Sequence, residues 1–498
     1  MNIFETICEQ ARPRMQNRAL VQVAPGGHVD TRTYGELIEA VRARALELEA
    51  AGIGRAWRVG MIAPQGIEFI ETALAILAAG ACMVPVADDH PPATVAELAR
   101  RAHLHALLAE EMTLSSIVKS CPGHFTGRSE DDPAPSVGAA RLQLLGTSVS
   151  TLPAEAQFAA LGPAYLRFTS GTTSERKGVV IGHARIHERL AAANKGLAIA
   201  PEDRVLWLLP MAHHFVVSIL LYLRYGATIL LPPSSLAPAV LELAEREQAT
   251  VLYASPYHMK LLAKDASQRR LDSMRLIIST AEGLRGDVAE TFARRYGRPI
   301  VQALGIMEAG LPVMNTASAA TKPEALGRPQ PDYEIWLRGE DGSRARGDSP
   351  ETSGEICIRG PGMLDAYLDP WIPSTQILEP DGFRTGDQGW FDADGDLHLV
   401  GRRAARINMA GMKFFCEEVE AVLDAHPAIE RSRVFATVHP HLGELPAAEI
   451  VLAPGAQPPA ARDLTAWCRE RLAAYMVPRK FDVVASLPLT PTGKLART

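Results

Sequence analysis

Cysteine is scarce in this sequence, and no targeting segment is evident. Six cysteines occur among 498 residues, at positions 8, 82, 121, 357, 416 and 468, and none of them forms a CxxC pair. Cysteines so few and so scattered exclude a disulfide framework, and we expect a reducing, cytoplasmic setting. The N-terminal residues also lack the basic stretch followed by an apolar run that marks a signal peptide.

Long hydrophobic runs and a strong excess of one charge are absent as well. The apolar stretch at residues 215–223 has about half the length needed to cross a bilayer, so it predicts a buried helix or strand and no membrane span. The formal net charge of −6 argues against nucleic acid as the main partner. Hydrophobic residues make up 47% and charged residues 22%, which is typical of a folded globular protein.

Short apolar runs alternate with helical segments and predict an α/β fold with a large and a small domain. The runs at 205–210, 227–232, 250–256 and 275–278 end at Gly, Pro or Ser, as buried parallel strands do. From residue 334, alternating strands separated by Asp-Gly turns predict a small, distorted antiparallel β module. We place the N-terminal domain at residues 1–402 and a C-terminal α+β domain at 403–498.

Finer predictions concern the C-terminal domain and one long connection. The sequence predicts helices over 417–424 and 463–474, with strands over 432–438, 447–452 and 481–485. Residues 122–163, which are rich in Gly, Pro, Ser and Ala, predict an irregular connection.

The strongest local motif is FTSGTTSERKGV, at residues 168–179. Five hydroxyl residues, two glycines and one lysine stand within residues 169–179. Such a backbone can turn its N–H groups toward one oxyanion, while hydroxyls add donors and lysine adds charge. The motif therefore predicts polyphosphate binding, although it differs from the common GxxxxGK[ST] loop. A flexible surface turn rich in Ser and Thr is the alternative.

This segment resembles the phosphate loop of the acyl-adenylate-forming superfamily. That superfamily includes acyl- and aryl-CoA synthetases, acyl- or aryl-carrier-protein ligases, peptide-synthetase adenylation domains and luciferase. Further blocks resemble the family's other motifs in the same order: PMAHHF at 210–215, STAEGL at 279–284, LGIME at 304–308, RTGD at 384–387, residues 401–402 and 408–420, and PTGK at 491–494. The resemblance implies a large N-terminal α/β domain and a small, mobile C-terminal α+β domain.

The resemblance also implies ATP and Mg²⁺ and gives roles to single residues. The phosphates are expected at Thr169, Ser170, Gly171, Thr172, Thr173 and Lys177. The adenine is expected beside Ala281, Glu282, Leu304 and Gly305, and the ribose beside Asp387 and Arg402. Glu308 is the expected ligand of Mg²⁺, and the expected catalytic set is Lys494, Thr173, Glu308 and His213. Lys494 would reach both the carboxylate and the α-phosphate as charge develops.

The substrate acid is expected among His213, His214, Val217, Ser255, Gly305 and Ile306. His214 stands where amino-acid-activating members carry an aspartate for the α-amino group, and an imidazole cannot replace that carboxylate. We therefore expect an aryl or acyl acid without a free α-amino group. His214 either hydrogen-bonds a ring hydroxyl of the acid or is a histidine of the protein core.

The implied reaction is ATP-dependent formation of acyl-AMP with release of pyrophosphate, followed by transfer to a thiol. The acceptor is CoA or the phosphopantetheine of a separate acyl carrier protein, beside Gly411. Ala404 and Ala405 stand where the family carries polar hinge residues, which bears on the efficiency of transfer. The alternatives are an enzyme that stops at acyl-AMP, a luciferase-like oxygenase, and a degenerate nucleotide-binding scaffold. Lys177, Glu308, Asp387, Arg402 and Lys494 all argue against the scaffold, because it would have lost such charges.

Overall fold

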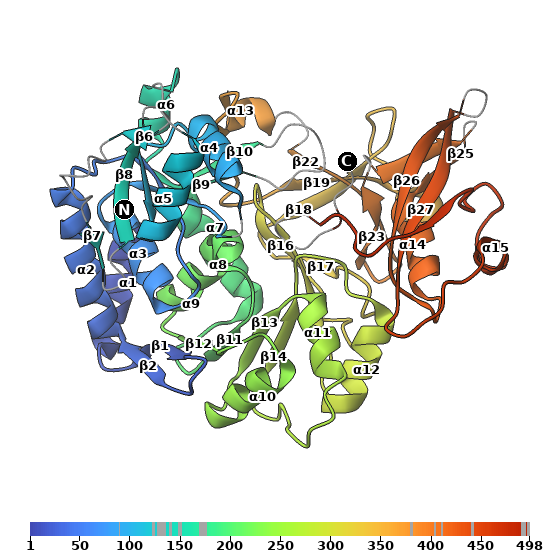
Figure 1. Cartoon of the computed structure of the whole chain (residues 1–498), viewed down its shortest axis with the longest axis horizontal. Coiled ribbons are helices and arrows are strands. Elements are labelled where there is room, and N and C mark those ends of the chain that lie inside the picture. Colours follow the sequence, from blue (N-terminus) through green and yellow to red (C-terminus); the bar gives the residue numbers. More distant parts are fainter. Residues whose placement is uncertain are drawn as a thin grey trace. The chain divides into compact units, whose positions relative to one another are not determined.

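The chain forms two compact units, whose elements are labelled in the computed structural model of Figure 1. The first unit contains Met1–Thr169, Lys177–Glu334 and Arg359–Phe383, and the second contains Ile335–Ile358 and Arg384–Thr498. The predicted boundary between residues 402 and 403 stays a prediction. The residues described are 1–88, 90–121, 125–126, 136–138, 142–147, 152–168, 177–378, 382–402, 405–409, 412–439, 443–489 and 495.

A nine-stranded sheet forms one layer of the first unit, in the order β17-β16-β15-β14-β13-β11-β12-β1-β2. From β15 to β1 its neighbouring strands pair in parallel, as the short apolar runs predict. The strands are β1 (Arg18–Val23), β2 (Val29–Thr33), β11 (Arg204–Trp207), β12 (Thr228–Leu231), β13 (Val251–Ala254), β14 (Leu276–Ser279), β15 (Val301–Ile306), β16 (Gly310–Met314) and β17 (Arg328–Pro329).

A ten-stranded sheet forms a second layer, in the order β21-β20-β10-β9-β4-β3-β5-β8-β6, with β7 paired to β8. Its strands are β3 (Arg58–Met61), β4 (Cys82–Pro85), β5 (Ala106–Ala109), β6 (Phe125–Thr126), β7 (Ser136–Val137), β8 (Leu142–Thr147), β9 (Pro163–Phe168), β10 (Gly178–Gly182), β20 (Ala366–Tyr367) and β21 (Ile372–Pro373). The prediction of an irregular connection over 122–163 is wrong where β8 pairs antiparallel with β5 and where helix α6 (Glu155–Ala160) forms. Leu142, Leu144 and Leu145 are buried there, and this apolar run is the reason a strand forms.

The helices of the first unit cover and separate these sheets. They are α1 (Ile3–Ala11), α2 (Tyr34–Ala50), α3 (Ile67–Ala78), α4 (Pro92–Arg101), α5 (Glu111–Ser120), α6, α7 (His183–Leu197), α8 (Met211–His214), a π-helix (Phe215–Ile219), α9 (Leu220–Arg224), α10 (Ala237–Arg246), α11 (Pro256–Ala263), α12 (Gly286–Tyr296) and α13 (Ser374–Ile377). The predicted burial of residues 215–223 is confirmed, because nearly all of them are buried.

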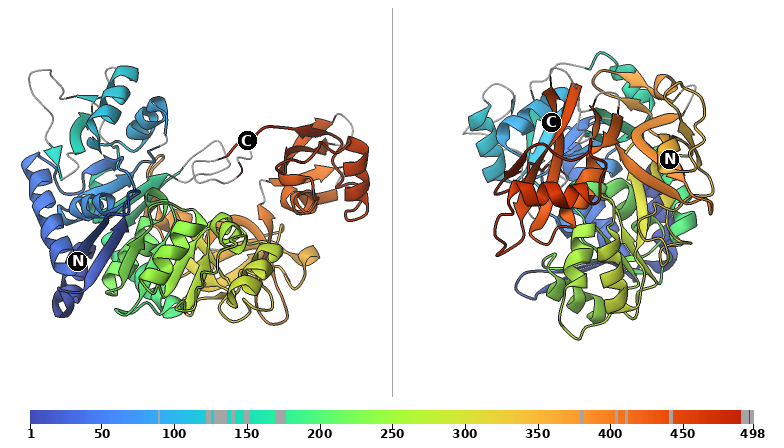
Figure 2. Two further views of the ribbon diagram at one scale, coloured as in Figure 1. Left: turned by 60° about the horizontal axis from the view of Figure 1, so that its bottom comes forward. Right: turned by 90° about the vertical axis from the view of Figure 1, so that its right-hand side faces the viewer.

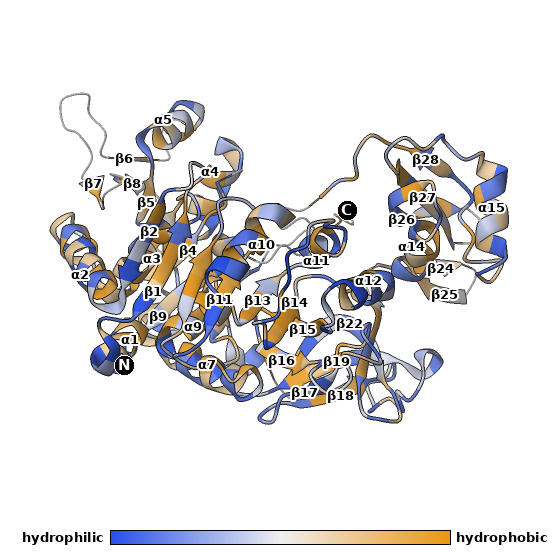
Figure 3. Cartoon of the chain, turned by 90° about the horizontal axis from the view of Figure 1, so that it is seen from below, coloured by the Kyte–Doolittle hydropathy of each residue, from blue (hydrophilic) through white to orange (hydrophobic). Residues whose placement is uncertain are grey.

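Alternate residues of the strands face different cores. On β11, Val205 and Trp207 belong to the core that also contains α1, α3, α7 and α9, whereas Leu206 belongs to the core under α10, α11 and α12. On β4, Met83 faces the first of these cores and Val84 faces a third one, which contains α4, α5 and α6. This period of two buries both faces of each sheet, so the strands are apolar along their length, as Figure 3 shows in orange for β4, β13 and β14.

The second unit contains a four-stranded antiparallel sheet and a small α+β body. The first sheet has the order β18 (Glu334–Arg338), β19 (Gly354–Arg359), β22 (Phe383–Phe391), β23 (Leu397–Arg402), as the β module predicts. The α+β body consists of β24 (Arg406–Met409), β25 (Met412–Phe415), α14 (Cys416–Asp424), β26 (Ile429–His439), β27 (Gly443–Leu452), α15 (Ala461–Arg469) and β28 (Phe481–Val483). Figure 2 shows it in orange-red to dark red as a sheet with packed helices.

Helix α15 is shorter than the sequence predicts. It ends at Arg469, whereas the predicted helix continues to residue 474. The backbone N–H groups of Arg471 and Leu472 both bond to the carbonyl of Cys468, so the chain tightens into turns there.

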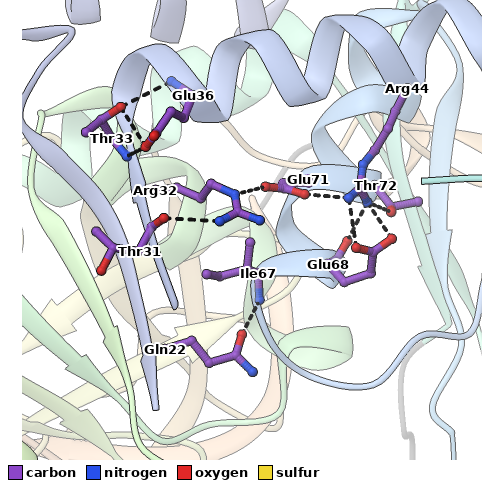
Figure 4. A network of polar contacts seen from close by, with 10 residues as sticks. All are labelled: Gln22, Thr31, Arg32, Thr33, Glu36, Arg44, Ile67, Glu68, Glu71 and Thr72. Atoms are coloured by element: carbon purple, nitrogen blue, oxygen red, sulfur yellow. Dashed lines mark hydrogen bonds and ion pairs between the residues drawn. The ribbon is translucent and has the colours of Figure 1, made fainter. Parts of the chain in front are cut away.

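A buried ionic network joins α2, α3 and β2, as Figure 4 shows. The Arg44 guanidinium donates to both carboxylate oxygens of Glu68, to Glu71 and to the Thr72 hydroxyl, and Arg32 donates to the other Glu71 oxygen. Burial raises the pKa of Glu71, while Arg44 and Arg32 oppose that shift. Because the desolvation of such a network offsets much of its attraction, we assign it the role of fixing how the two helices meet.

His105 makes the first unit sensitive to acid. It stacks on Trp57 at 4.9 Å, and its Nδ1 accepts the backbone N–H of Arg58 at 3.0 Å. Burial, with a contribution from the Arg58 charge, lowers the pKa of His105 to about 4. The unfolded chain, with an ordinary pKa of about 6.5, therefore binds the proton more readily, and stability falls as the pH drops from 6.5 toward 4.

We expect His105→Asn to reduce this pH dependence. Its amide oxygen can accept the same backbone N–H but does not titrate. Urea unfolding should show wild type losing about 1–2 kcal/mol more than the variant between pH 7 and pH 5. Equal losses in both proteins would contradict the assignment. Burial also lowers the pKa of His183 to about 4. His183 titrates in both proteins, so its contribution to the pH dependence cancels from the comparison.

Candidate active site

The turn between β15 and β16 carries a buried carboxylate. Glu308 lies in this turn, 9% exposed, and its Oε1 accepts a 3.1 Å hydrogen bond from the Tyr367 hydroxyl of β20. Burial raises the pKa of Glu308, while the Tyr367 hydrogen bond and the charges of Lys177 and Arg189 oppose that shift. The carboxylate is thus held in a poorly solvated place where positive charge surrounds it.

Lys177 and Arg189 supply that positive charge. The Lys177 ammonium lies 4.8 Å from the ring centroid of Tyr367, over the ring face. Arg189, on α7 and 1% exposed, donates to the carbonyls of Gly362 and Met307. Its hydrogen bonds fix the Glu308 turn against α7, and because they go to carbonyls its charge stays available to an anion.

The chain breaks its helical path at His214, between α8 and the π-helix. The His214 backbone has φ −128° and ψ 11°, outside the helical region. Three side chains donate to three successive carbonyls at this break: the Tyr165 hydroxyl to Ala212, the Arg167 guanidinium to His213, and the Ser218 hydroxyl to His214. The π-helix is a rare form that often marks functional sites. These donors hold the predicted acid-binding histidines in one conformation.

An aromatic pair borders His214 on one side. Its imidazole meets Trp207 edge-on with centroids 6.3 Å apart, and Trp207 stacks on Tyr253 at 5.3 Å. Both histidines are half-buried, as is Val217 on the π-helix. Ser255 caps α11, with its Oγ 2.8 Å from His258 Nδ1. The Trp207 ring, stacked on Tyr253, gives the surroundings of His214 an aromatic character, which suits an aromatic or other apolar ligand.

The predicted adenine-binding segments lie side by side. β14 and β15 pair in parallel with Ser279 opposite Gln302, so the residues that follow each strand are neighbours. The ideal Cβ position of Gly305 is 3.6 Å from the Thr280 hydroxyl oxygen. Ala281 has φ 82°, a left-handed conformation that disfavours any residue with a Cβ. Glu282 and Leu304 are half-buried and Gly305 is exposed, so this edge remains accessible.

In the second unit, the predicted ribose pair lies across two strands. Asp387 on β22 stands opposite Arg402 on β23 in the antiparallel register. The Asp387 N–H donates to the Thr385 hydroxyl, which donates to the Ile356 carbonyl, and Gly386 between them has φ 76°. This local bend fixes the half-buried Asp387 at the end of the strand pair.

Several predicted site residues lie outside the described residues. They are Thr169, Ser170, Gly171, Thr172, Thr173, Gly411 and Lys494. Ala404 is also among them, whereas Ala405 is described and lies in the buried core of the C-terminal α+β body.

Three residues of the site escape prediction from the sequence. Tyr367 reaches Glu308 across 59 residues, and Arg189 reaches the Glu308 turn from the middle of α7. Arg167 has a local signal, since it is a charged residue in an otherwise apolar strand directly before the phosphate motif. For Tyr367 and Arg189 no local pattern distinguishes them from ordinary core residues.

The carboxylate of Glu308 fits a metal ion that arrives with its substrate. Among the described residues no group of three His, Cys, Asp or Glu side chains is arranged to hold a metal. Mg²⁺ commonly binds through one or two carboxylates plus substrate phosphates, so a single buried Glu308 is sufficient for that mode.

In the described part of the chain no helix is both long and apolar enough to cross a membrane.

Known proteins similar to this chain match it over nearly its whole length. The chain is 29% identical to naringenin synthase from Pestalotiopsis fici over 93% of its own length, but it spans 18% of that protein. It is 27% identical to feruloyl-CoA synthase from Amycolatopsis sp, covering 93% of this chain and 92% of the relative. The structure of o-succinylbenzoate coenzyme A synthetase from Bacillus subtilis in complex with AMP aligns with a TM-score of 0.82 and 24% identity, over 99% of this chain and 97% of that one.

Family profiles match most of the sequence. The profile of the AMP-binding enzyme covers residues 7–368, and that of the AMP-binding enzyme C-terminal domain covers residues 418–494. The predicted fold class, a large N-terminal α/β domain with a small C-terminal α+β domain, is confirmed by these matches and by the structural alignment. The predicted superfamily resemblance is confirmed as well: the chain belongs to the family of AMP-binding enzymes.

Proposed function

We propose that this chain is a ligase that activates an aryl or acyl carboxylic acid with ATP and transfers the acyl group to a thiol. In the first step a carboxylate oxygen attacks the α-phosphorus of ATP, the bond to the bridging oxygen breaks, and pyrophosphate leaves. In the second step a thiolate sulfur attacks the carbonyl carbon, the bond to the AMP oxygen breaks, and AMP leaves. The acceptor is CoA, or the phosphopantetheine of a separate carrier protein.

The observation that carries this proposal is the set of charges around Glu308. Lys177 and Arg189 act on the same carboxylate, and Arg167, beside His213, also acts on it. A reaction that brings a carboxylate to a triphosphate pushes anions together and therefore needs such positive charge. A scaffold that only binds nucleotide has no need for a buried carboxylate with this environment.

Each residue has a place in the proposed reaction. The loop of Thr169 to Thr173, with Lys177, binds the β- and γ-phosphates, Asp387 and Arg402 hold the ribose, and Lys494 stabilises the developing charge at the α-phosphate. Glu308 holds Mg²⁺, which neutralises phosphate charge when bound. Ala281, Glu282, Leu304 and Gly305 border the adenine. Gly411, which has no Cβ, leaves room for pantetheine.

The similar proteins support the choice of acid and acceptor. Feruloyl-CoA synthase and o-succinylbenzoate coenzyme A synthetase are both named for CoA products of aromatic acids. The Trp207 ring beside His214, together with Val217 and Ile306, suits such an acid better than it suits a charged amino acid. We therefore propose an aryl acid as the first choice and CoA as the first acceptor.

A pyrophosphate-release screen tests this function. The panel contains hydroxylated and plain aryl acids, short and long acyl acids, and the twenty amino acids, each with no thiol, with CoA and with a holo carrier protein. We expect release with aryl or acyl acids and formation of a thioester. Pyrophosphate release without thioester would indicate an enzyme that stops at acyl-AMP, and strong turnover of an amino acid would contradict the substrate class.

His214→Ala is expected to change the preference for hydroxylated acids. If His214 hydrogen-bonds a ring hydroxyl, wild type prefers the hydroxylated acid, because only that acid can form this hydrogen bond. The variant should lose about 10-fold in the ratio of kcat/KM for a hydroxylated acid to that for a plain acid of equal size. An unchanged ratio would leave His214 as a packing residue against Trp207.

A further inference from the structure

Arg167 is a half-buried arginine that lacks a carboxylate partner in the described part of the chain. Side chains of β9 alternate between two cores, so Arg167 shares a face with Tyr165, which lies in the core toward α8. Both residues donate to carbonyls of α8, Tyr165 to Ala212 and Arg167 to His213. The guanidinium is therefore anchored beside the predicted acid-binding histidine.

Among the described residues of the first unit, the buried arginines Arg44, Arg58 and Arg189 use their donors more fully than the half-buried Arg167 does. Arg44 bonds two glutamates, and Arg58 forms two hydrogen bonds with Glu155. Arg189 makes three hydrogen bonds to carbonyls. Arg167 has one hydrogen bond within the described residues, although a guanidinium carries five N–H donors. Glu308 acts on its charge only at longer range.

A guanidinium placed this way is suited to an anion that arrives from outside. Proteins rarely bury a cation without a partner, since its desolvation is costly when nothing compensates it. The planar fork of arginine matches the two oxygens of a carboxylate. Among the anions of the proposed reaction, the substrate carboxylate is the one whose binding site includes His213. Lys177, which lies toward Tyr367 and Glu308, serves the phosphates instead.

We propose that Arg167 binds the carboxylate of the acid substrate before adenylation. The inference rests on the proposed function and adds a residue to it. The His213 carbonyl fixes one N–H of the guanidinium, and the remaining donors receive the carboxylate. Formation of acyl-AMP removes the carboxylate charge, so the contribution of Arg167 ends at that point and the transfer to the thiol does not depend on it.

The test compares Arg167→Gln and Arg167→Lys in the full chain. With the best acid from the pyrophosphate-release screen, Arg167→Gln should raise the KM of the acid about 10–100-fold, the range for loss of a charged hydrogen bond. The KM of ATP should stay within about twofold. Arg167→Lys, which keeps the charge but loses the planar fork, should recover only part of the loss in the KM of the acid. Transfer from supplied acyl-AMP to the thiol should be unchanged in both variants.

A matched variant at a distant arginine serves as the control. Arg204 is the first residue of β11, at the end of the strand away from Trp207 and His214, and it donates to the Gln248 carbonyl. Arg204→Gln should therefore have the same KM for the acid as wild type. Thermal unfolding confirms that each variant is folded, and Arg167→Lys carries the test if Arg167→Gln does not fold.

Each of the other outcomes would overturn a specific part of the proposal. An acid KM that Arg167→Gln leaves unchanged would overturn the carboxylate role, as would a rise in the KM of ATP alone, which would place Arg167 on the phosphates. Equal losses in adenylation and thiol transfer would show a purely structural role. Absence of pyrophosphate release by wild type with every acid would overturn the proposed function, and this inference with it.

Discussion

Replacement of Lys494 by alanine is expected to slow adenylation by about 10²–10³-fold, the usual cost of removing one preorganised donor from a transition state. The physical reason is that this lysine would stabilise the negative charge that develops between the carboxylate and the α-phosphate. Transfer from supplied acyl-AMP to the thiol should be nearly unaffected, because the family resemblance implies that the lysine leaves the site before that step.

The measurement separates the two half-reactions. Pyrophosphate release reports adenylation, and thioester formation from supplied acyl-AMP reports transfer. Lys480→Ala is a suitable control, since Lys480 is an exposed lysine of the same unit that pairs with Asp482. Equal losses in the two half-reactions would refute the assignment of Lys494 to the first step alone.

Glu308→Gln is expected to lower adenylation by about 10²-fold and to leave the protein at least as stable as wild type. Activity falls because the amide lacks the negative charge that a metal ion bound to ATP would meet. Stability does not fall, because burial raises the pKa of Glu308, which means that the ionised side chain is disfavoured in the folded protein. The Gln side chain can still accept the Tyr367 hydrogen bond.

Thermal unfolding and pyrophosphate release on the same preparations check this prediction. Glu97→Gln, a change at an exposed glutamate that pairs with Arg100, is the control. A melting temperature clearly below that of wild type would mean that the Glu308 carboxylate stabilises the fold, and the separation of function from stability would be wrong. Unchanged activity would remove Glu308 from the proposed site.

The predictable parts of the molecule are those that local patterns specify. The run at residues 205–210 is short, apolar and ends at Pro210, so the sequence predicts the strand that β11 forms there. The motif that ends in Glu308 and the motif that contains His213 and His214 are both recognisable in the sequence, because contiguous residues carry them. The sequence does not predict strand β8, because Gly, Pro and Ser in the flanking residues obscure its apolar run.

The unpredicted parts depend on contacts between distant residues. The hydrogen bond from Tyr367 to Glu308 spans 59 residues, and that from Arg167 to the His213 carbonyl spans 46. Neither is visible in a window of sequence, since only the packing of β20 and β9 against other elements brings these groups together. The same holds for the π-helix, because its residues Phe215–Ile219 have the apolar character of an ordinary buried helix.

The π-helix makes this segment sensitive to length as well as to side chains. A π-turn inserts about one residue into an α-helical path, so deletion of Val216 is expected to convert the segment before α9 into a regular α-helical turn. Residues before and after the deletion would then rotate relative to one another by about 100°. His213 and His214 would turn away from the groups that hold their carbonyls. Relatives that are one residue shorter in the π-helix are therefore expected to present different side chains to the acid, even where the neighbouring residues are identical.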